Sequence, residues 1–290
     1  MKLLTKFNIV LIVFFGAGGF LIAQLAKDFL LNNARNQVVQ QAELMMAGAK
    51  ATREYTNDQI KPLLLKNPDH EINFLPQTVP AFSAATIFNS LKKQYTDYSY
   101  REATLNPTNL IDRAEDWEAD IIRYFADQPD QKQLIGERDT PIGRQLYLAK
   151  PMRATASCLE CHSEPSVAPA AMIRKYGAVN GFGWQVNQVI AAQIVSVPMN
   201  VPNKIAEEAY HKLVTFLVIV FVVTILALDA ALYMLVIRPL HTVSQAADRI
   251  SRGETDLEPL IVRGKDEIAD VTASFNRMRV SLVKALKMLE

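Results

Sequence analysis

The sequence predicts an α+β domain between two membrane-spanning helices, followed by a purely α-helical domain. Three patterns support this prediction. Two apolar runs, at residues 7–26 and 213–237, are each long enough to cross a bilayer as a helix. The residues between the runs change from helical to strand-like periodicity. After the second run, apolar side chains recur at alternating spacings of three and four.

The charge balance argues against a nucleic-acid partner. The chain has 31 Lys and Arg against 30 Asp and Glu, for a formal net charge of +1. Nucleic-acid-binding proteins usually carry a basic excess that neutralises phosphates. We therefore expect no contact with nucleic acid. The two apolar runs, in contrast, predict contact with membrane lipid.

The first apolar run, residues 7–26, is expected to be a retained membrane helix preceded by a cytoplasmic segment, residues 1–6. A cleaved signal peptide is the alternative, because Lys2 and Lys6 form a positive region ahead of the run. The run is longer than the apolar core of a signal peptide, and Gln24-Leu25-Ala26 is a poor cleavage site.

The second run, residues 213–237, is interrupted only by Asp229 and is followed directly by Arg238. Cations concentrate on the cytoplasmic side of membrane spans, so both termini are expected inside and residues 27–212 outside. Asp229 is either a helix-contact residue or a tolerated polar position, and ionisable residues within spans warrant a functional hypothesis.

The two cysteines of the chain lie in the segment Cys158-Leu159-Glu160-Cys161-His162. This is the attachment pattern of c-type haem: each thiol adds to one vinyl group of the porphyrin, and the histidine ligates the iron. We expect one covalent haem c held by Cys158, Cys161 and His162. Because such haem is attached outside the bacterial inner membrane, the motif agrees with the orientation and predicts that residues 27–212 are periplasmic.

Three other interpretations of the cysteine pair are weaker. A structural zinc site needs four ligands, and the chain has no second cysteine pair. A redox dithiol normally opens a helix after a strand, whereas Thr155, Ser157 and Pro165 indicate a loop around the motif. A chance pairing is the third interpretation, and the specificity of the spacing disfavours it.

The second axial ligand of the iron is expected to be a methionine. A thiolate is excluded because there is no third cysteine, and His70 is a histidine that could reach the haem from a loop. We favour Met46, then Met45, because a ligand on the helix leading to the membrane would couple the iron to that helix. For each methionine a packing role is the commoner one, and an open site suited to a diatomic gas is the alternative.

Within residues 27–212, helices precede strands. A long helix is predicted at residues 27–61 and is ended by Pro62, with further helices at 81–95 and 113–126. Period-two alternation predicts a strand at 145–150 and a hairpin within 184–197. Helices followed by a small antiparallel sheet indicate an α+β domain.

Several short segments accompany the haem motif: Arg53-Glu54-Tyr55-Thr56, Val79-Pro80-Ala81, Tyr98-Ser99-Tyr100-Arg101-Glu102, Leu105-Asn106-Pro107-Thr108-Asn109, Gly181-Phe182-Gly183-Trp184 and Val195-Ser196-Val197-Pro198-Met199. With these segments, residues 27–205 resemble a haem-binding, PAS-like sensor domain of bacterial receptors. The resemblance implies a PAS-like sheet enclosing one haem c, in a role that is sensory rather than catalytic.

Residues 238–290 carry two apolar seams with three-four spacing, preceded by Pro239 and joined by an apolar connector. The seam residues are Leu240, Val243, Ala247 and Ile250, then Ile268, Val271, Phe275, Met278, Leu282, Ala285 and Leu289. With Asp266-Glu267-Ile268 opening the second helix, the region resembles a HAMP domain. The resemblance implies a parallel four-helix bundle shared by two chains, and therefore a homodimer through the HAMP domain and the membrane helices.

Together the two resemblances imply a membrane-bound haem c sensor that detects redox state or a diatomic gas and passes the change through the second span to the HAMP domain. No kinase, cyclase or methyl-accepting pattern is present in residues 238–290, so the output is expected to come from a cytoplasmic signalling partner or from an extension that this sequence does not include. The alternatives are a membrane-anchored electron-transfer cytochrome and a small-ligand chemoreceptor with a structural haem. No catalytic residue is predicted and no enzyme is expected.

Overall fold

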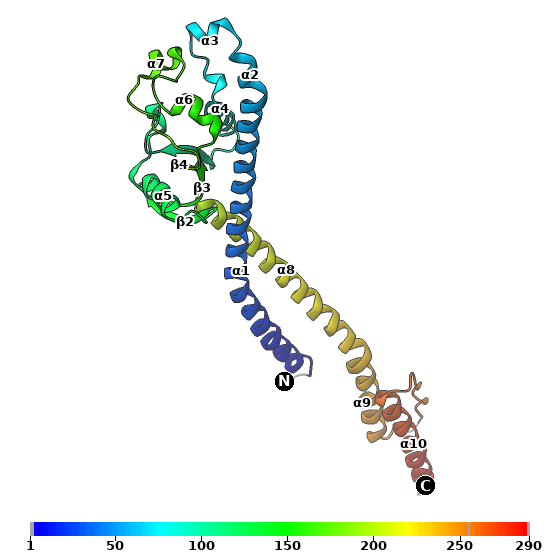
Figure 1. Cartoon of the computed structure of the whole chain (residues 1–290). Helices are drawn as coiled ribbons and strands as arrows, with labels where there is room; N and C mark the ends of the chain where they lie inside the picture. Colours follow the sequence, from blue (N-terminus) through cyan, green and yellow to red (C-terminus); the bar gives the residue numbers. More distant parts are fainter. Residues whose placement is uncertain (1–2, 255, 289–290) are drawn as a thin grey trace. The chain divides into compact units, whose positions relative to one another are not determined.

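The computed structural model describes residues 3–254 and 256–288, and the chain divides into two compact units (Figure 1). One unit is Asp28–Ala209, and the other combines Met1–Lys27 with Tyr210–Glu290. Helix α1 (Leu3–Tyr55) contains both the first apolar run and most of the long helix predicted to follow it.

The first unit is built on a four-stranded antiparallel sheet with strand order β1-β4-β3-β2. The strands are β1 (Ser99–Thr104), β2 (Leu134–Thr140), β3 (Gly143–Arg153) and β4 (Val189–Pro198). Strand β4 lies between β1 and β3 and is buried over most of its length, which explains why its sequence is apolar except for Gln193 and Ser196. The prediction of helices combined with a small antiparallel sheet is confirmed.

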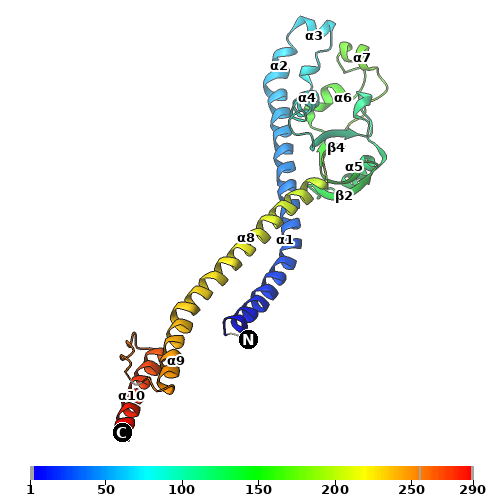
Figure 2. The ribbon, with the colours of Figure 1, turned by 180° about the vertical axis from the view of Figure 1, so that it is seen from behind.

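Two helices cover opposite faces of the sheet (Figures 1 and 2). The α1 face is a cluster of Val38, Ala42, Met46, Leu146, Leu148, Val195 and Val197. The other face packs on α5 (Asp116–Asp127), through a cluster of Ala103, Ile121, Ile122, Phe125, Ala149, Ala192 and Ile194. Leu148 and Ala149 point to opposite clusters, as the alternation of side chains along a strand requires.

The predicted hairpin within residues 184–197 is wrong. Only Val189–Pro198 is a strand, because a turn precedes it: Gln188 N donates to Gln185 O at 3.1 Å, and Asn187 takes a φ of 68°. Strands β1 and β2 were not predicted, because several of their side chains are charged and pair with the covering helices, at positions where apolar side chains would have marked a strand. Arg101 on β1, for example, lies 3.0 Å from the buried carboxylate of Glu118 on α5.

The long helix extends beyond its predicted end. A π-helical turn, η1 (Thr56–Ile60), follows α1 and leads into α2 (Lys61–Leu64). Pro62 lies in the first turn of α2, where a missing N–H group is tolerated. Helix α3 (Pro68–Ile72) is capped by Asn67, whose side-chain oxygen accepts a hydrogen bond from Asp69 N. Helix α4 covers Pro80–Leu91.

The second unit contains the two apolar runs and the C-terminal helices. Two continuous helical stretches, Leu4–Leu64 and Asn200–Ser251, are long and apolar enough to cross a membrane. The latter combines α8 (Asn200–Leu232), a π-helical turn η4 (Tyr233–Ile237) and α9 (Arg238–Ser251).

The C-terminal helix α10 (Glu267–Lys287) is joined to α9 by an extended connector. The side chain of Asn276 holds this connector against α10: its Nδ2 donates to Leu260 O at 2.8 Å, and its Oδ1 accepts from Leu260 N at 2.9 Å. Ile250 and Phe275 are buried members of the predicted seams, and Leu289 lies outside the described residues.

Candidate functional site

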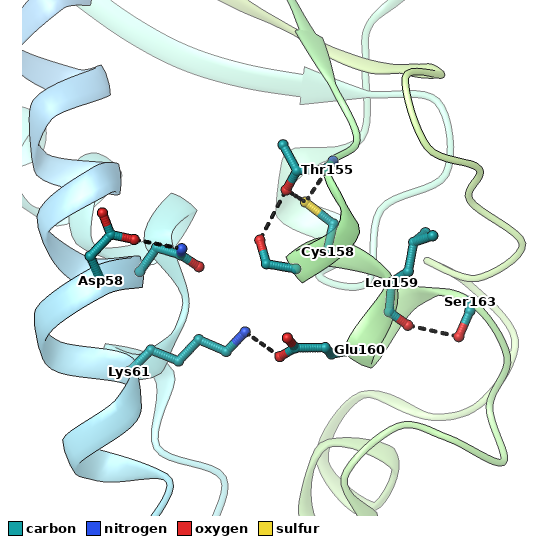
Figure 3. Close-up of polar contacts among 9 residues, drawn as sticks. Asp58, Lys61, Thr155, Cys158, Leu159, Glu160 and Ser163 are labelled. Atoms are coloured by element: carbon teal, nitrogen blue, oxygen red, sulfur yellow. Dashed lines mark hydrogen bonds and ion pairs between the residues drawn. The ribbon is translucent and has the colours of Figure 1, made fainter.

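The Cys-x-x-Cys-His segment forms a short helix, α6 (Ala156–His162), and not the predicted loop. Thr155 precedes the helix, and its N–H donates to Cys158 Sγ at 3.4 Å (Figure 3). Residues three and four apart lie on one face of a helix. The helix therefore presents Cys158, Cys161 and His162, at positions i, i+3 and i+4, on a common face, and the two cysteines form no disulfide.

The imidazole of His162 contacts three groups. Its Nδ1 lies 2.7 Å from the carbonyl oxygen of Gly181 and 3.4 Å from Thr108 Oγ1, and its ring stacks on the indole of Trp184 with centroids 4.0 Å apart and an interplanar angle of 14°. Because a carbonyl only accepts, Nδ1 carries the hydrogen and Nε2 keeps its lone pair. A histidine oriented in this way is prepared to ligate a metal through Nε2.

The loop that carries Gly181 and Trp184 is held against a second loop. Gly181 N donates to Asn106 Oδ1 at 3.0 Å, and Asn106 Nδ2 donates to Phe182 O at 3.2 Å. Gly181 has a φ of +83°, and a Cβ atom there would lie 2.0 Å from Thr108 Oγ1. Two of the segments that carry the family resemblance thus meet at His162, and position 181 requires glycine.

Burial sets the ionisation of the motif. It lowers the pKa of His162 below its ordinary value; the hydrogen bond to Gly181 opposes this shift and the nearby Lys61 charge adds to it. The imidazole is therefore neutral near pH 7, the form that binds metals. Burial raises the pKa of the Cys161 thiol, with Lys61 opposing and Glu160 and Cys158 adding to the shift.

An ion pair joins α6 to the end of the long helix. Lys61 Nζ lies 2.7 Å from Glu160 Oε2, with the Lys61 side chain 14% exposed and that of Glu160 60% exposed (Figure 3). Lys61 directly follows the π-helical turn Thr56–Ile60. Turns of this kind are rare and frequently occur at functional sites.

A buried polar cluster joins α1 to the sheet near this point. Arg53 Nη1 on α1 lies 2.5 Å from Glu102 Oε2 on β1. Tyr100 Oη donates to the other carboxylate oxygen of Glu102 at 2.5 Å, and Gln193 Nε2 on β4 donates to Tyr100 Oη at 3.0 Å. Burial and the neighbouring carboxylate raise the pKa of Tyr100, which keeps its hydroxyl protonated.

The predicted methionines take packing positions. Met46 is 2% exposed within the cluster of α1 against β3 and β4, and Met45 packs against this cluster and against Ala84 and Phe88. His70 is buried; its Nδ1 accepts from Leu75 N at 3.4 Å, and its Nε2 has no partner among the residues the structure describes. The structure brings Cys158, Cys161 and His162 together, and iron ligation by Met46 or Met45 stays a prediction.

Four residues of the site were missed as such from the sequence: Lys61, Thr108, Gly181 and Trp184. Two of them lie in a Gly-x-Gly-Trp run, and paired glycines beside an aromatic residue signal a loop that approaches another group closely. No local pattern singles out Lys61, because its partner Glu160 lies far along the chain.

Comparisons with known proteins match both parts of the chain. The Tll0287-like family model, described as Tll0287, matches residues 31–198, and the HAMP domain model matches residues 231–284. The crystal structure of the cyanobacterial heme-protein Tll0287 is similar with a TM-score of 0.45 and 12% identity, over 56% of this chain and 95% of that one. No curated protein sequence matches significantly.

Replacing Gly181 tests the loop that positions His162. Gly181→Ala places a Cβ against Thr108, so we expect it to destabilise the domain by about 2–4 kcal/mol, from left-handed backbone strain plus overpacking. Gly183→Ala is the matched control, since its φ is +80° but no atom lies within 4 Å of the added Cβ. Urea unfolding of the detergent-solubilised chain measures both, and equal losses would contradict the proposed close contact.

Proposed function

We propose that this chain, which belongs to the Tll0287-like family, is a membrane-bound sensor. In this proposal the chain holds one haem c covalently and passes a change at the haem to its HAMP domain. The observation that carries this proposal is the presence, in one chain, of Cys158, Cys161 and His162 on one helix face and of a HAMP domain at residues 231–284.

The residues present fit a c-type haem. The two thiols would form the thioether bonds, and His162 would supply Nε2 to the iron while Gly181 and Trp184 fix the ring. The hydrogen bond from Nδ1 makes the imidazole a stronger ligand and holds its orientation. When bound, the haem supplies an iron whose charge changes by one on oxidation and which can take up a diatomic gas at an open site.

For the second axial ligand we propose Met46, then Met45, on the helix that leads to the membrane. The choice rests on the chemistry of methionine as an iron ligand and on the absence of a third cysteine from the sequence. Met46 sits in an apolar cluster, so ligation would compete with its packing. An open sixth position is the alternative.

The chain is proposed to be a two-pass protein of the bacterial inner membrane with a periplasmic haem domain and cytoplasmic termini. The two apolar helices, the cations beside them and the haem motif support this placement. The HAMP domain supports a homodimer and a cytoplasmic signalling partner.

Two structural routes lead from the haem helix to the membrane helices. Lys61 and Glu160 connect α6 to the far end of the helix that begins with the first span. The cluster of Arg53, Glu102, Tyr100 and Gln193 connects that helix to β4, and β4 leads into α8 through Met199. If these contacts have two arrangements, a change at the haem that favours one of them would shift the whole chain from one conformation toward the other.

One observation favours a second function, chemoreception of a small organic ligand. An open cavity of about 370 Å³ lies beside α5, with Arg123, Arg153 and apolar side chains such as Ile122 and Val189 in its lining. In that case ligand affinity would not depend on the oxidation state of the iron. An electron-transfer relay, by contrast, would have no use for a HAMP domain.

Removing the thiols tests the covalent haem. We expect the Cys158→Ser/Cys161→Ser variant to lose haem that stays bound during denaturing electrophoresis, because no thioether bond can form. Glu160→Gln, between the two cysteines, is the matched control and should keep it. Haem staining of membranes from cells with a cytochrome c maturation system measures the outcome, and an unstained native chain would contradict the proposal.

Charge removal at Lys61 tests the electrostatic link between helix and haem. A positive charge near the iron stabilises its reduced state, so Lys61→Met should lower the reduction potential by roughly tens of millivolts. Lys61→Arg keeps the charge and should leave the potential near its native value. Lys50→Met removes a charge from an exposed position on α1 and serves as the second control. Equal potentials in all four proteins would contradict the link.

A further inference from the structure

Two polar side chains meet within the apolar part of the second unit. Asn8 Nδ2 on α1 donates to Asp229 Oδ2 on α8 at 3.0 Å. Both residues interrupt the apolar runs, and Asp229 is the single acidic or basic residue of residues 213–237. Ionisable groups in a span are costly and usually pair within the protein.

A second contact places the same faces of the two helices together. The rings of Phe15 and Phe221 have centroids 5.8 Å apart. From Asn8 to Phe15 the first helix advances about two turns, and from Asp229 to Phe221 the other helix goes back about two turns. The two contacts therefore define one antiparallel register of α1 against α8.

The polar pair has no substitute nearby. Asn8 Oδ1 and Asp229 Oδ1 are buried, and neither has a hydrogen-bond partner in residues 3–254 or 256–288. Thr224, the closest hydroxyl residue N-terminal to Asp229 in α8, donates to Val220 O of its own helix. An unpaired polar group within hydrocarbon costs free energy, so the register that joins Asn8 to Asp229 is favoured over its neighbours.

We propose that Asn8 and Asp229 form a polar clamp that fixes the axial register of the two membrane helices within one chain. A slide of one helical turn moves a residue by about 5.4 Å and breaks the clamp. Movement of α8 relative to α1 is therefore a tilt or rotation about this pair and not an axial slide. The clamp depends on the two spans and not on the haem, so it stands whether or not the proposed sensory function is correct.

Cross-linking of cysteine pairs measures the register. The full haem-loaded chain in nanodiscs would carry Phe15→Cys with either Phe221→Cys, in register, or Ile225→Cys, about one turn away. A short bismaleimide joins the thiols without changing the redox state. The proposed thioether bonds would block the two native cysteines, and a parallel Cys158→Ser/Cys161→Ser background removes them so that the result does not depend on the haem. In the native background we expect faster cross-linking of the in-register pair.

Loss of the clamp should reduce the ratio of the two cross-linking rates, in-register pair over shifted pair, by roughly 3- to 10-fold. This is the range expected for one interhelical hydrogen bond in a membrane. Asn8→Leu and Asp229→Leu should both have this effect, whereas Asp229→Asn keeps a polar partner and should retain the preference. Thr224→Val, whose hydroxyl bonds within its own helix, is the matched control and should change nothing.

Two results would overturn the proposal. The first is equal cross-linking of the two pairs in the native background. The second is an unchanged ratio of the two cross-linking rates in Asn8→Leu. This variant makes the first span more apolar, so it keeps membrane insertion even if Asp229→Leu alters insertion of the second span. Loss of haem signalling with an intact register would contradict the sensory function and leave the clamp in place.

Discussion

The hydrogen bond between His162 Nδ1 and the carbonyl oxygen of Gly181 determines how the rest of the candidate site is arranged. It selects the tautomer that leaves Nε2 free to bind iron. It also brings the Gly181 loop so close to Thr108 that only glycine fits. Because Asn106 holds the same loop through its side chain, one short contact positions the ring, the loop and the end of β1 together.

Contacts leading away from this site are polar and directional. The Lys61–Glu160 pair reaches the long helix, and the Arg53–Glu102 pair, with Tyr100 and Gln193, reaches the central strand. Apolar packing tolerates small sliding, whereas hydrogen-bonded pairs exchange between discrete arrangements. The same principle applies in the unit that contains the two apolar helices, where the hydrogen bond between Asn8 and Asp229 is proposed to favour one register among several that apolar packing alone would allow.

Local patterns in the sequence predicted those parts whose structure is local. The spacing of Cys158, Cys161 and His162 was enough to predict the motif, and the three-four spacing of apolar residues was enough to predict the HAMP helices. The helix α6 was not predicted because Ser157 and Pro165 are typical loop residues. The partners of His162, Lys61 and Asp229 could not be predicted, since each lies at least 19 positions away, as Gly181 does from His162.

Strands β1 and β2 carry charged side chains on the faces that the helices cover. Arg101 and Glu102 on β1 face opposite sides of the sheet, yet both are satisfied by ion pairs, with Glu118 and Arg53 respectively. Alternation of apolar and polar residues, the usual sign of a strand, is therefore missing although both faces are covered. These two pairs connect β1 to α5 and to α1.

In the proposed function, a change in the oxidation state of the haem iron changes the conformation of the HAMP domain. A spin label at Ser281→Cys, an exposed position of α10, would report the distance between the two chains of the proposed dimer in nanodiscs. We expect different distance distributions in the oxidised and reduced protein, and no difference in the Cys158→Ser/Cys161→Ser variant. Identical distributions in the oxidised and reduced native chain would contradict the proposed function.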